Sequence, residues 1–306
     1  MDEQRAGAYD VVVVGSANLD IVLEVPEIPA PGETVLAVGS AQGPGGKGAN
    51  QAAAAARAGA RTGFVAALGD DAAAGVLREE LARAGVDLGA VRTVSAPTGT
   101  AYVAVDARGE NAIVVDPGAN ALLTALSAAE RQVIRDARVV LCQLEVPLAT
   151  VADALAAAAG LAVLNAAPAQ PLAPEVLRAV DVLVVNQHEA RELGGTADLD
   201  AAVGRLLRDV PEVVVTLGVA GALLQHRNSA PVRLPGVPAR TVVDTTGAGD
   251  AFCGALAAAR AGGAEAVPAA ELACAAGSLS VERPGAGRSA PTLAEARARL
   301  QEVGRG

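Results

Sequence analysis

The sequence predicts a doubly wound α/β fold, in which a mostly parallel central sheet carries helices on both faces, together with a small β-sheet lid. Short Val-rich runs alternate with Ala-rich helical segments along most of the 306 residues, a pattern typical of parallel sheets covered on both sides. Two stretches without a helix, residues 17–38 and 98–115, interrupt that alternation. Only two Tyr and two Phe occur in a chain that is 52% hydrophobic, so the core must be built from Ala, Val, Leu and Gly.

The predicted central strands are continuous apolar runs, as expected when both faces of a sheet are buried. In chain order they span residues 10–14, 63–67, 139–144, 161–165, 182–185 and 213–217. The helices predicted between them span residues 48–58, 71–84, 148–159 and 199–208.

The two interrupting stretches are each predicted to form a pair of strands joined by a turn. The first contains LDIVLEV, a proline-rich turn ending in Pro31-Gly32, and ETVLAV; the second contains TAYVAVD, Arg108-Gly109 and ENAIVV. Pro-Gly fits a type II turn, and the second sequence fits a short hairpin. We expect a small sheet that covers a cleft and excludes water; the alternative is an edge extension of the main sheet. The predicted division is a core of residues 1–16, 43–96 and 117–306 and a lid of residues 17–42 and 97–116.

Composition excludes several classes of partner and location. The net charge is −10, without the basic stripe that a nucleic-acid binder needs. No apolar run approaches the roughly 20 residues that span a bilayer, and the first ten residues, MDEQRAGAYD, do not resemble a secretory signal. Three widely separated cysteines show no zinc-ligand spacing. We expect a cytoplasmic protein with buried thiols in a reducing compartment, and neither nucleic acid nor membrane as a partner.

Residues 243–252, VDTTGAGDAF, carry the strongest chemical signal. The segment passes through Gly-Ala-Gly into a helical pattern, so the N–H groups of Gly247, Ala248 and Gly249 lie at a positive helix end that can hold an anion. Asp250 in the first turn would repel a simple phosphate ligand. It fits as a base that takes a proton from an attacking hydroxyl while the N–H groups stabilise a transferring phosphoryl group. The alternative is an ordinary helix N-terminus with an acidic residue.

Two further motifs place polar side chains beside glycines. Residues 45–51, GGKGANQ, open an Ala-rich helix but lack the spacing and hydroxyl of a Walker A loop. Their glycines let backbone approach a ligand, and Asn50 can donate to and accept from sugar hydroxyls. In residues 15–20, GSANLD, Asn18 and Asp20 share a strand face, which suits a polyol; alone, the segment would be a turn cap. The missing GxGxxG argues against a nicotinamide-dependent oxidoreductase.

Taken together, these motifs resemble a known family. GSANLD, GGKGANQA, QLEVP, NAAPA, NQHE, TLGVAG and DTTGAGD occur in the order found in the ribokinase-like (PfkB) carbohydrate kinases, from about residue 10 to residue 300. The combination of GGKGAN and DTTGAGD is the specific part of the resemblance. It implies a doubly wound α/β core with a small β lid that often clasps the lid of a second subunit, and therefore a homodimer.

The resemblance also implies phosphoryl transfer from ATP to a sugar hydroxyl. Asp250 would be the base that activates the primary hydroxyl, and Gly247, Ala248 and Gly249 would form the anion hole. The groups that would hold the sugar are Asn18, Asp20, Gly46, Lys47, Asn50, Glu145 and Asp250. The groups that would contact the nucleotide are Asn186, Thr216, Gly218, Gly221 and Gly249.

Two metal sites are implied as well. Glu189 would organise Mg²⁺ and its waters near the phosphates. A monovalent cation, K⁺, would order the anion-hole loop without touching the substrate. Its matching positions, several acting through backbone carbonyls, are Asp244, Thr246, Ser280, Arg283, Gly285 and Ser289.

The chain departs from the family pattern at three positions. Pro44 precedes the two glycines where many relatives have an aromatic or small residue, Val146 stands where Ser or Thr is usual, and Cys274 replaces a nucleotide-contacting His of some relatives. Ribose, phosphorylated at O5, is the favoured acceptor over 2-deoxyribose, a fructose-type sugar or adenosine. Four aromatic residues offer little surface for stacking the base of a nucleoside, which argues against adenosine. A sugar-binding relative without catalysis is the remaining alternative, and the retained Asp250 argues against it.

Overall fold

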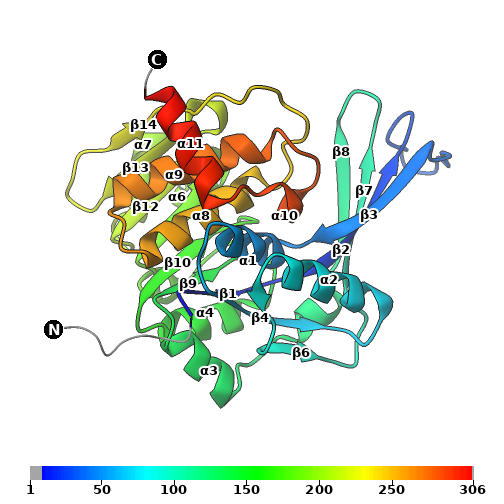
Figure 1. The fold of residues 1–306 in the computed structure, drawn as a ribbon, viewed down its shortest axis with the longest axis horizontal. Helices are drawn as coiled ribbons and strands as arrows, with labels where there is room; N and C mark the ends of the chain where they lie inside the picture. Colours follow the sequence, from blue (N-terminus) through cyan, green and yellow to red (C-terminus); the bar gives the residue numbers. More distant parts are fainter. Residues whose placement is uncertain (1–8, 305–306) are drawn as a thin grey trace.

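The central sheet of the computed structural model, which describes residues 9–304, runs in the order β14-β13-β12-β11-β10-β9-β1-β4-β5 (Figure 1). Predicted core residues 1–8 and 305–306 lie outside the described residues. Pairing is parallel from β5 through β12 and antiparallel for β13 and β14. The strands are β1 Val11–Val14, β4 Thr62–Leu68, β5 Val86–Asp87, β9 Val139–Cys142, β10 Leu161–Asn165, β11 Val182–Asn186, β12 Glu212–Thr216, β13 Ala222–His226 and β14 Val232–Leu234, with β6 Val91–Thr93 paired to β4.

Helices cover both faces of this sheet, which confirms the predicted doubly wound fold (Figure 1). Alternate residues of one strand point to opposite faces, and β1 shows this directly. Val11 and Val13 belong to the core beneath α1, α2, α8 and α9, whereas Val12 and Val14 belong to the core beneath α3, α4, α6 and α7. The helices are α1 Lys47–Arg57, α2 Ala72–Arg83, α3 Ala128–Arg135, α4 Leu148–Ala157, α5 Pro174–Leu177, α6 Gln187–Gly194, α7 Leu199–Leu206, α8 Ala248–Ala261, α9 Ala266–Ser280, α10 Ala286–Ser289 and α11 Leu293–Val303.

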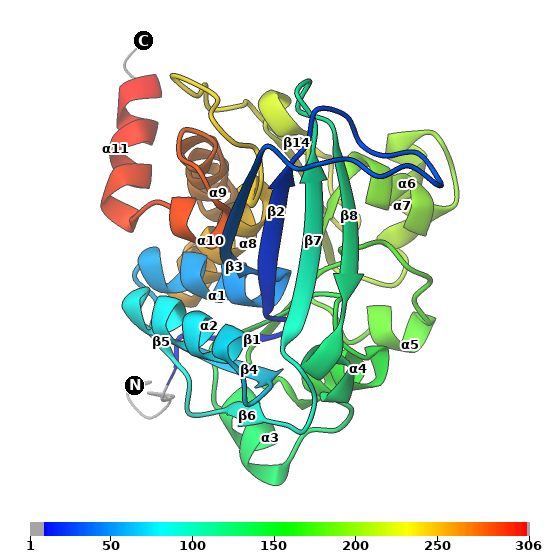
Figure 2. The same cartoon turned by 90° about the vertical axis from the view of Figure 1, so that its right-hand side faces the viewer.

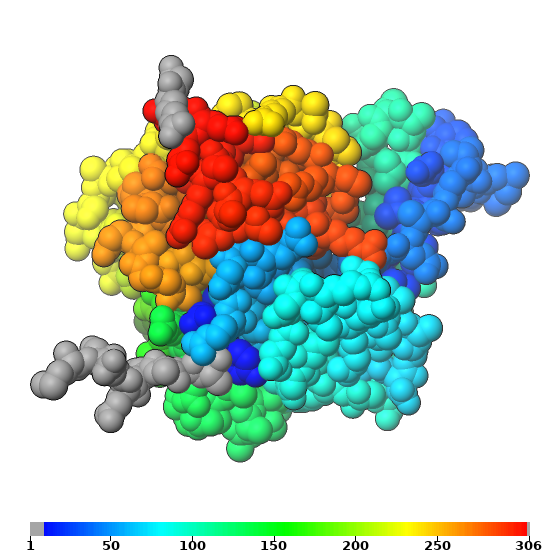
Figure 3. All heavy atoms as spheres, viewed as in Figure 1, coloured from blue at the N-terminus to red at the C-terminus, as the bar shows by residue number. Residues whose placement is uncertain are grey.

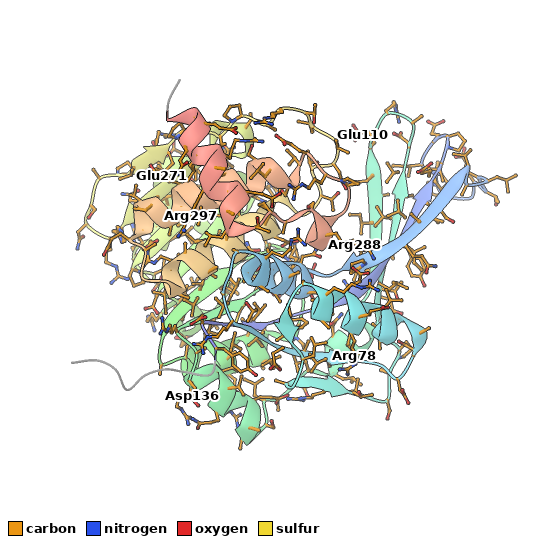
Figure 4. All side chains as sticks on the ribbon, in the orientation of Figure 1. Arg78, Glu110, Asp136, Glu271, Arg288 and Arg297 are labelled. Atoms are coloured by element: carbon orange, nitrogen blue, oxygen red, sulfur yellow. The ribbon has the colours of Figure 1, made fainter. Side chains whose placement is uncertain are left out.

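A second sheet, in the order β3-β2-β7-β8, stands off one side of the core (Figures 2 and 3). Its strands are β2 Asn18–Glu24, β3 Gly39–Gly45, β7 Gly99–Val105 and β8 Asn111–Asp116. Because it is a separate sheet built from two pieces of chain, the edge-extension alternative is wrong. Glu110 marks the far end of its β7–β8 hairpin and Arg288 lies near its base (Figure 4). We call this four-stranded sheet the lid.

One lid strand is not where the sequence pattern predicts it. ETVLAV, residues 33–38, lies in the connection between β2 and β3, and Leu36 and Val38 are 84% and 74% exposed. The antiparallel register, which joins Asn18 to Gly45 and Glu24 to Gly39, gives the pairing instead to the polar, Gly-containing segment that leads into α1. Pairing with β2 therefore overrides strand propensity here. Strand β3 also runs past the predicted lid boundary at residue 42, and the domain boundaries stay a prediction.

Helices α1 and α8 lie unusually close together, and this contact positions the polar residues described below. A Cβ atom at Gly254 of α8 would lie 2.5 Å from the Cβ of Ala54 and 2.7 Å from the carbonyl oxygen of Gln51, both in α1. Only glycine allows that approach. Small residues at this contact let the two helices meet almost backbone to backbone. This fits a core that contains few aromatic residues.

Candidate active site

A cavity of about 160 Å³ opens where the carboxyl ends of β10, β11 and β12 meet the start of α8. Ligands of open α/β sheets bind at this end of the strands. The predicted site residues that line it are Lys47, Asn186, Glu189, Thr216, Gly247, Ala248, Gly249 and Asp250. We call it the central cavity.

The start of α8 is shaped by a residue that must be glycine. Gly247 is the N-cap with φ 78°, and a Cβ there would lie 2.6 Å from the Cα of Ala286. The first N–H groups of a helix have no partner within it, and Gly247, Ala248 and Gly249 all line the central cavity. The Ala248 N–H makes a long hydrogen bond, 3.4 Å, to the Thr245 carbonyl. The helix N-terminus therefore faces the cavity beside Asp250.

Asp250 is only 8% exposed and accepts a hydrogen bond at each carboxylate oxygen. Asn50 donates to Oδ2 at 3.0 Å and Gln51 donates to Oδ1 at 2.9 Å. Burial raises the pKa of Asp250, while Lys47 and the two amide donors oppose that increase. The predicted base thus lies in a desolvated position with its charge supported from α1.

Lys47 and Glu145 lie next to the same carboxylate. The backbone N–H of Lys47 and the hydroxyl of Ser16 donate to Glu145 Oε2 at 2.9 and 2.5 Å. Burial lowers the pKa of the Lys47 ammonium, but attraction to Asp250, Glu145 and Glu189 outweighs burial and leaves the pKa above its usual value. Lys47 is therefore a cation among carboxylates in the central cavity.

The lid contributes Asp20 from β2. A Cβ at Gly45 would lie 2.0 Å from Asp20 Oδ1, so the carboxylate rests against glycine backbone. Burial, followed by repulsion from Glu145 and Asp250, raises the pKa of Asp20 to about 6. These interactions place the lid carboxylate in the electrostatic field of the core carboxylates.

Asn18 lies where β2 leaves the core. Its side chain is 3% exposed, and its Oδ1 accepts a hydrogen bond of 2.7 Å from Asn120. Gly46, the N-cap of α1 with φ 85°, packs close to this strand, because a Cβ there would lie 2.8 Å from the Asn18 backbone nitrogen. Asn18 and Asp20 thus adjoin the glycines at the start of α1, and the Asn50 N–H donates to the Gly46 carbonyl at 3.0 Å.

The residues predicted to contact nucleotide and Mg²⁺ follow β11 and β12. Asn186 and Glu189 form the capping box of α6: Asn186 Oδ1 accepts from the Glu189 N–H at 2.9 Å, and Glu189 Oε2 accepts from the Asn186 N–H at 2.8 Å. Burial raises the pKa of Glu189. Thr216 ends β12 and lines the cavity, whereas Gly218 and Gly221 lie in the turn after it and are not among the lining residues within 9–304.

The positions predicted for a monovalent cation lie on two adjoining loops. Asp244 Oδ1 accepts from the Thr246 N–H at 2.8 Å and Oδ2 accepts from the Gly285 N–H at 2.9 Å. The N–H groups of Val243 and Asp244 both donate to the Val281 carbonyl. Three of the remaining side chains have other partners: Ser280 bonds the Gly277 carbonyl, Ser289 bonds the Ala286 carbonyl, and Arg283 pairs with Glu295. The positions predicted for the cation are therefore held on two loops that hydrogen-bond to each other through Asp244. Within residues 9–304, no cluster of three or more His, Cys, Asp or Glu side chains could hold a metal ion.

Several polar residues near the site received no role from sequence reasoning: Ser16, Gln51, Asn120, Gln143, Asn165, Thr245 and Cys253. Gln51 follows Asn50 directly in the GGKGANQ motif, and Gln143 and Asn165 end apolar strand runs, so position could have indicated them. Asn120 gives no such signal, because it reaches Asn18 across 102 positions of sequence. Cys142, Cys253 and Cys274 are free and buried, as predicted, although Cys253 also lines the central cavity.

Known proteins share both the sequence motifs and the fold of this chain. The pfkB family carbohydrate kinase pattern matches residues 8–293. The chain belongs to the PfkB family. This PfkB family member is 36% identical over 296 residues to a ribokinase of Haemophilus influenzae, with 93% of this chain and 96% of that protein covered. It is 39% identical over 260 residues to a bifunctional ribokinase/ribose-5-phosphate isomerase A of Fructilactobacillus sanfranciscensis, covering 81% of this chain but only 48% of that relative.

A solved structure extends the comparison of this PfkB family member to the fold. The ribokinase of Arabidopsis thaliana, complexed with ribose and ATP, superposes with a TM-score of 0.89 at 35% identity. The match covers 95% of this chain and 98% of that one. Among the helices within residues 9–304, none is both long and apolar enough to cross a membrane.

Proposed function

We propose that this protein is an ATP-dependent ribokinase, a phosphotransferase that phosphorylates D-ribose at O5 to give ribose 5-phosphate and ADP. One observation carries the proposal: the Asp250 carboxylate, the Lys47 ammonium and the open N-terminus of α8 share one cavity. A base, a cation and an anion cradle together suit phosphoryl transfer, which asks mainly for positioning and charge neutralisation. The likeness to ribokinases, including one complexed with ribose and ATP, supports ribose as the acceptor.

In the proposed reaction Asp250 accepts the proton of the ribose O5 hydroxyl. The O5 oxygen attacks the γ-phosphorus of ATP, a new P–O bond forms, and the bond to the β–γ bridging oxygen breaks to release ADP. The N–H groups of Gly247, Ala248 and Gly249 and the Lys47 ammonium face the charge that develops on the phosphoryl oxygens. Asn18, Asp20, Gly46, Asn50 and Glu145 orient the sugar hydroxyls.

The nucleotide is proposed to lie along Asn186, Thr216, Gly218, Gly221 and Gly249. Glu189 fits a water-mediated Mg²⁺ contact, because only one of its oxygens is used by the capping box and it lines the cavity; Mg²⁺ usually keeps several waters and binds phosphate oxygens. When bound, Mg²⁺ would neutralise phosphate charge.

A monovalent cation, K⁺, is proposed between the loops that carry Asp244 and Gly285. The donor set fits, because these loops are hydrogen-bonded together and offer backbone carbonyls beside the α8 N-terminus. The positions are Asp244, Thr246, Ser280, Arg283, Gly285 and Ser289. Their role is to hold the loop before Gly247 in one conformation.

The proposal also covers assembly and location. Residues 17–42 and 97–116 act as a lid that closes over the sugar and forms a homodimer contact. The exposed apolar side chains of β8 support this contact.

The protein is proposed to be cytoplasmic. Three buried free thiols support a reducing compartment.

The decisive assay measures ADP release with ATP, Mg²⁺ and K⁺ across ribose, 2-deoxyribose, fructose, adenosine and no acceptor. We expect ribose-dependent turnover that falls about 10²- to 10⁴-fold in Asp250→Asn, because the general base is lost. Turnover that survives this substitution would remove the proposed base, and no turnover with any acceptor would favour a sugar-binding protein. Equal rates with and without K⁺ would refute the cation site.

A further inference from the structure

A chain of buried amide hydrogen bonds leads from the central sheet to Asp250. Gln51 is fully buried and uses its whole amide group. Its Nε2 donates to Asp250 Oδ1 and to Asn165 Oδ1, each at 2.9 Å, and its Oε1 accepts from Gln143 Nε2 at 2.6 Å. Each of its two amide hydrogens therefore has one acceptor, and its carbonyl oxygen has a donor.

The partners of Gln51 define which way its amide points. Turned by 180°, Gln51 would place its Oε1 against two acceptor oxygens and its Nε2 against the donor of Gln143. Asn165 cannot adapt without a loss, because its own Nδ2 donates to the Val184 carbonyl at 3.2 Å. Burial makes each mismatch costly, since water is not there to replace a lost partner.

We propose that Gln51 is a positioning residue for Asp250 and that Gln143 holds Gln51 in the orientation that serves the base. The inference rests on the proposed function, in which Asp250 accepts the proton of the acceptor hydroxyl. Gln51 engages Oδ1 while Asn50 engages Oδ2 at 3.0 Å, so the plane of the carboxylate is held from two consecutive residues of α1. Amides do not titrate in this range, so Gln51 holds the charge of the base and transfers no proton itself.

The electrostatic surroundings explain why such support is needed. The titratable groups that face Asp250 are Lys47 of α1, Glu145 after β9, Asp20 of β2 and Cys253 of α8. Burial raises the pKa of Asp250 most strongly, and the donors from Gln51 and Asn50 counteract it together with Lys47. Loss of the Gln51 donor therefore raises this pKa further and leaves the base protonated to higher pH.

The first test is Gln51→Met, which keeps length and burial but removes the donor. The acid limb of kcat/KM against pH should move upward by about one to two pH units, as expected for a hydrogen bond to a charged group. Because Gln51 is fully buried and is not among the residues within 9–304 that line the central cavity, kcat should fall while the KM for ribose changes little. The matched control is Gln132→Met on α3, which removes an amide donor from the exposed Asp136 and should leave the profile unchanged.

The second test separates positioning from packing. Gln143→Met should shift the acid limb in the same direction by a smaller amount, because Gln51 keeps its donor but loses its orientation. In the double variant the Gln143 change should add nothing to Gln51→Met, since Gln143 acts through Gln51. Additive effects, or a drop in melting temperature with an unmoved acid limb, would overturn the proposal and leave both residues a packing role.

A measurement that does not depend on turnover distinguishes a failure of this inference from a failure of the proposed function. Carbon-13 NMR of Asp carboxyls in the full-length protein, with Asp250→Asn to assign the signal, follows the titration of Asp250 directly. Gln51→Met should raise its midpoint by the same amount as the kinetic limb. An unmoved midpoint counts against the role of Gln51, whereas absence of sugar-dependent turnover in the unaltered protein counts against the kinase.

Discussion

Several carboxylates lie close together at the site, and their mutual repulsion destabilises the folded chain. Asp20, Glu145 and Asp250 repel one another, and Lys47 is the cation that lies among them. Active sites commonly hold such groups at a cost in stability, because the substrate completes their interactions. Substitution of one carboxylate should therefore stabilise the free protein while weakening its function.

Asp20 offers the clearest case. Its folded-state pKa of about 6 lies above the usual 3.8, so stability is lost as pH rises through about 6 and ionised Asp20 destabilises the fold. Asp20→Asn should raise the free energy of unfolding by about 2–3 kcal/mol at pH 8 and by little at pH 4, while raising the KM for ribose. Urea unfolding at both pH values, with Asp116→Asn as an exposed lid control, checks this. An equal gain at both pH values would contradict the electrostatic cause.

At the scale of single residues, the sequence indicates a candidate site residue where that residue lies in a short local motif. Asp250 and Asn50 lie in short glycine-containing segments whose chemistry is readable, and the structure brings them into contact. Asn120 reaches Asn18 through a contact between residues far apart in sequence, which no local pattern encodes. Gln143 is distant from Gln51 in sequence too, although its place at the end of an apolar strand run is a local signal.

At the scale of elements, the meeting of α1 and α8 governs the site, because Asn50 and Gln51 lie on one helix and Asp250 on the other. Gly254 lets these helices approach, and a side chain there would strike Ala54 and the α1 backbone. Separation of the helices would withdraw both amides from the base.

Two glycine substitutions separate the effect of crowding at the α1–α8 contact from the general effect of replacing glycine by alanine in a helix. Gly254→Ala should lower the free energy of unfolding by about 1–3 kcal/mol through overpacking and should reduce kcat more than the KM. Gly204→Ala in α7, where nothing lies within 4 Å of the new Cβ, should raise stability by about 0.5–1 kcal/mol. Urea unfolding and steady-state kinetics of both variants provide the test. A Gly254→Ala protein of normal stability and rate would show that the contact is not constrained.

The elements differ in how well the sequence predicts them. The central strands are recognisable because burial on both faces leaves uninterrupted apolar runs, as in β1 and β11. The segment 33–38 misleads because most of its apolar side chains are exposed in the β2–β3 connection, where the Val38 N–H donates to the Glu24 carbonyl. Strand β3 forms instead from weak strand formers through its register with β2. The antiparallel edge of β13 and β14 was not predicted, since their pattern is short and partly polar.

Over the whole molecule, the lid exposes apolar side chains that a lone subunit leaves in water. The register places Tyr102 opposite Val114 and beside Ile21, all on the lid face opposite Asp20. Tyr102 and Val114 are 47% and 68% exposed. Such a cross-strand apolar row suits contact with a second copy.

The proposed homodimer can be broken at this row. Tyr102→Glu combined with Val114→Glu should convert the dimer to a monomer, because two charges would be buried at the contact. Val303→Glu, an exposed position of α11, serves as the control and should leave the dimer intact. Sedimentation equilibrium gives the mass of each protein. A monomeric unaltered protein at micromolar concentration would disprove assembly through the lid.

The glycine and alanine contact between α1 and α8 has a further consequence, in side-chain entropy. Alanine and glycine have no rotamers to lose on folding, so the two helices dock at the Gly254–Ala54 contact without a loss of side-chain entropy there. The side chains that do lose rotamers between these helices include Asn50 and Gln51, which hydrogen-bond the Asp250 carboxylate. Small residues at the helix contact therefore keep this entropy cost low, and they bring the amide donors of one helix within reach of the carboxylate on the other.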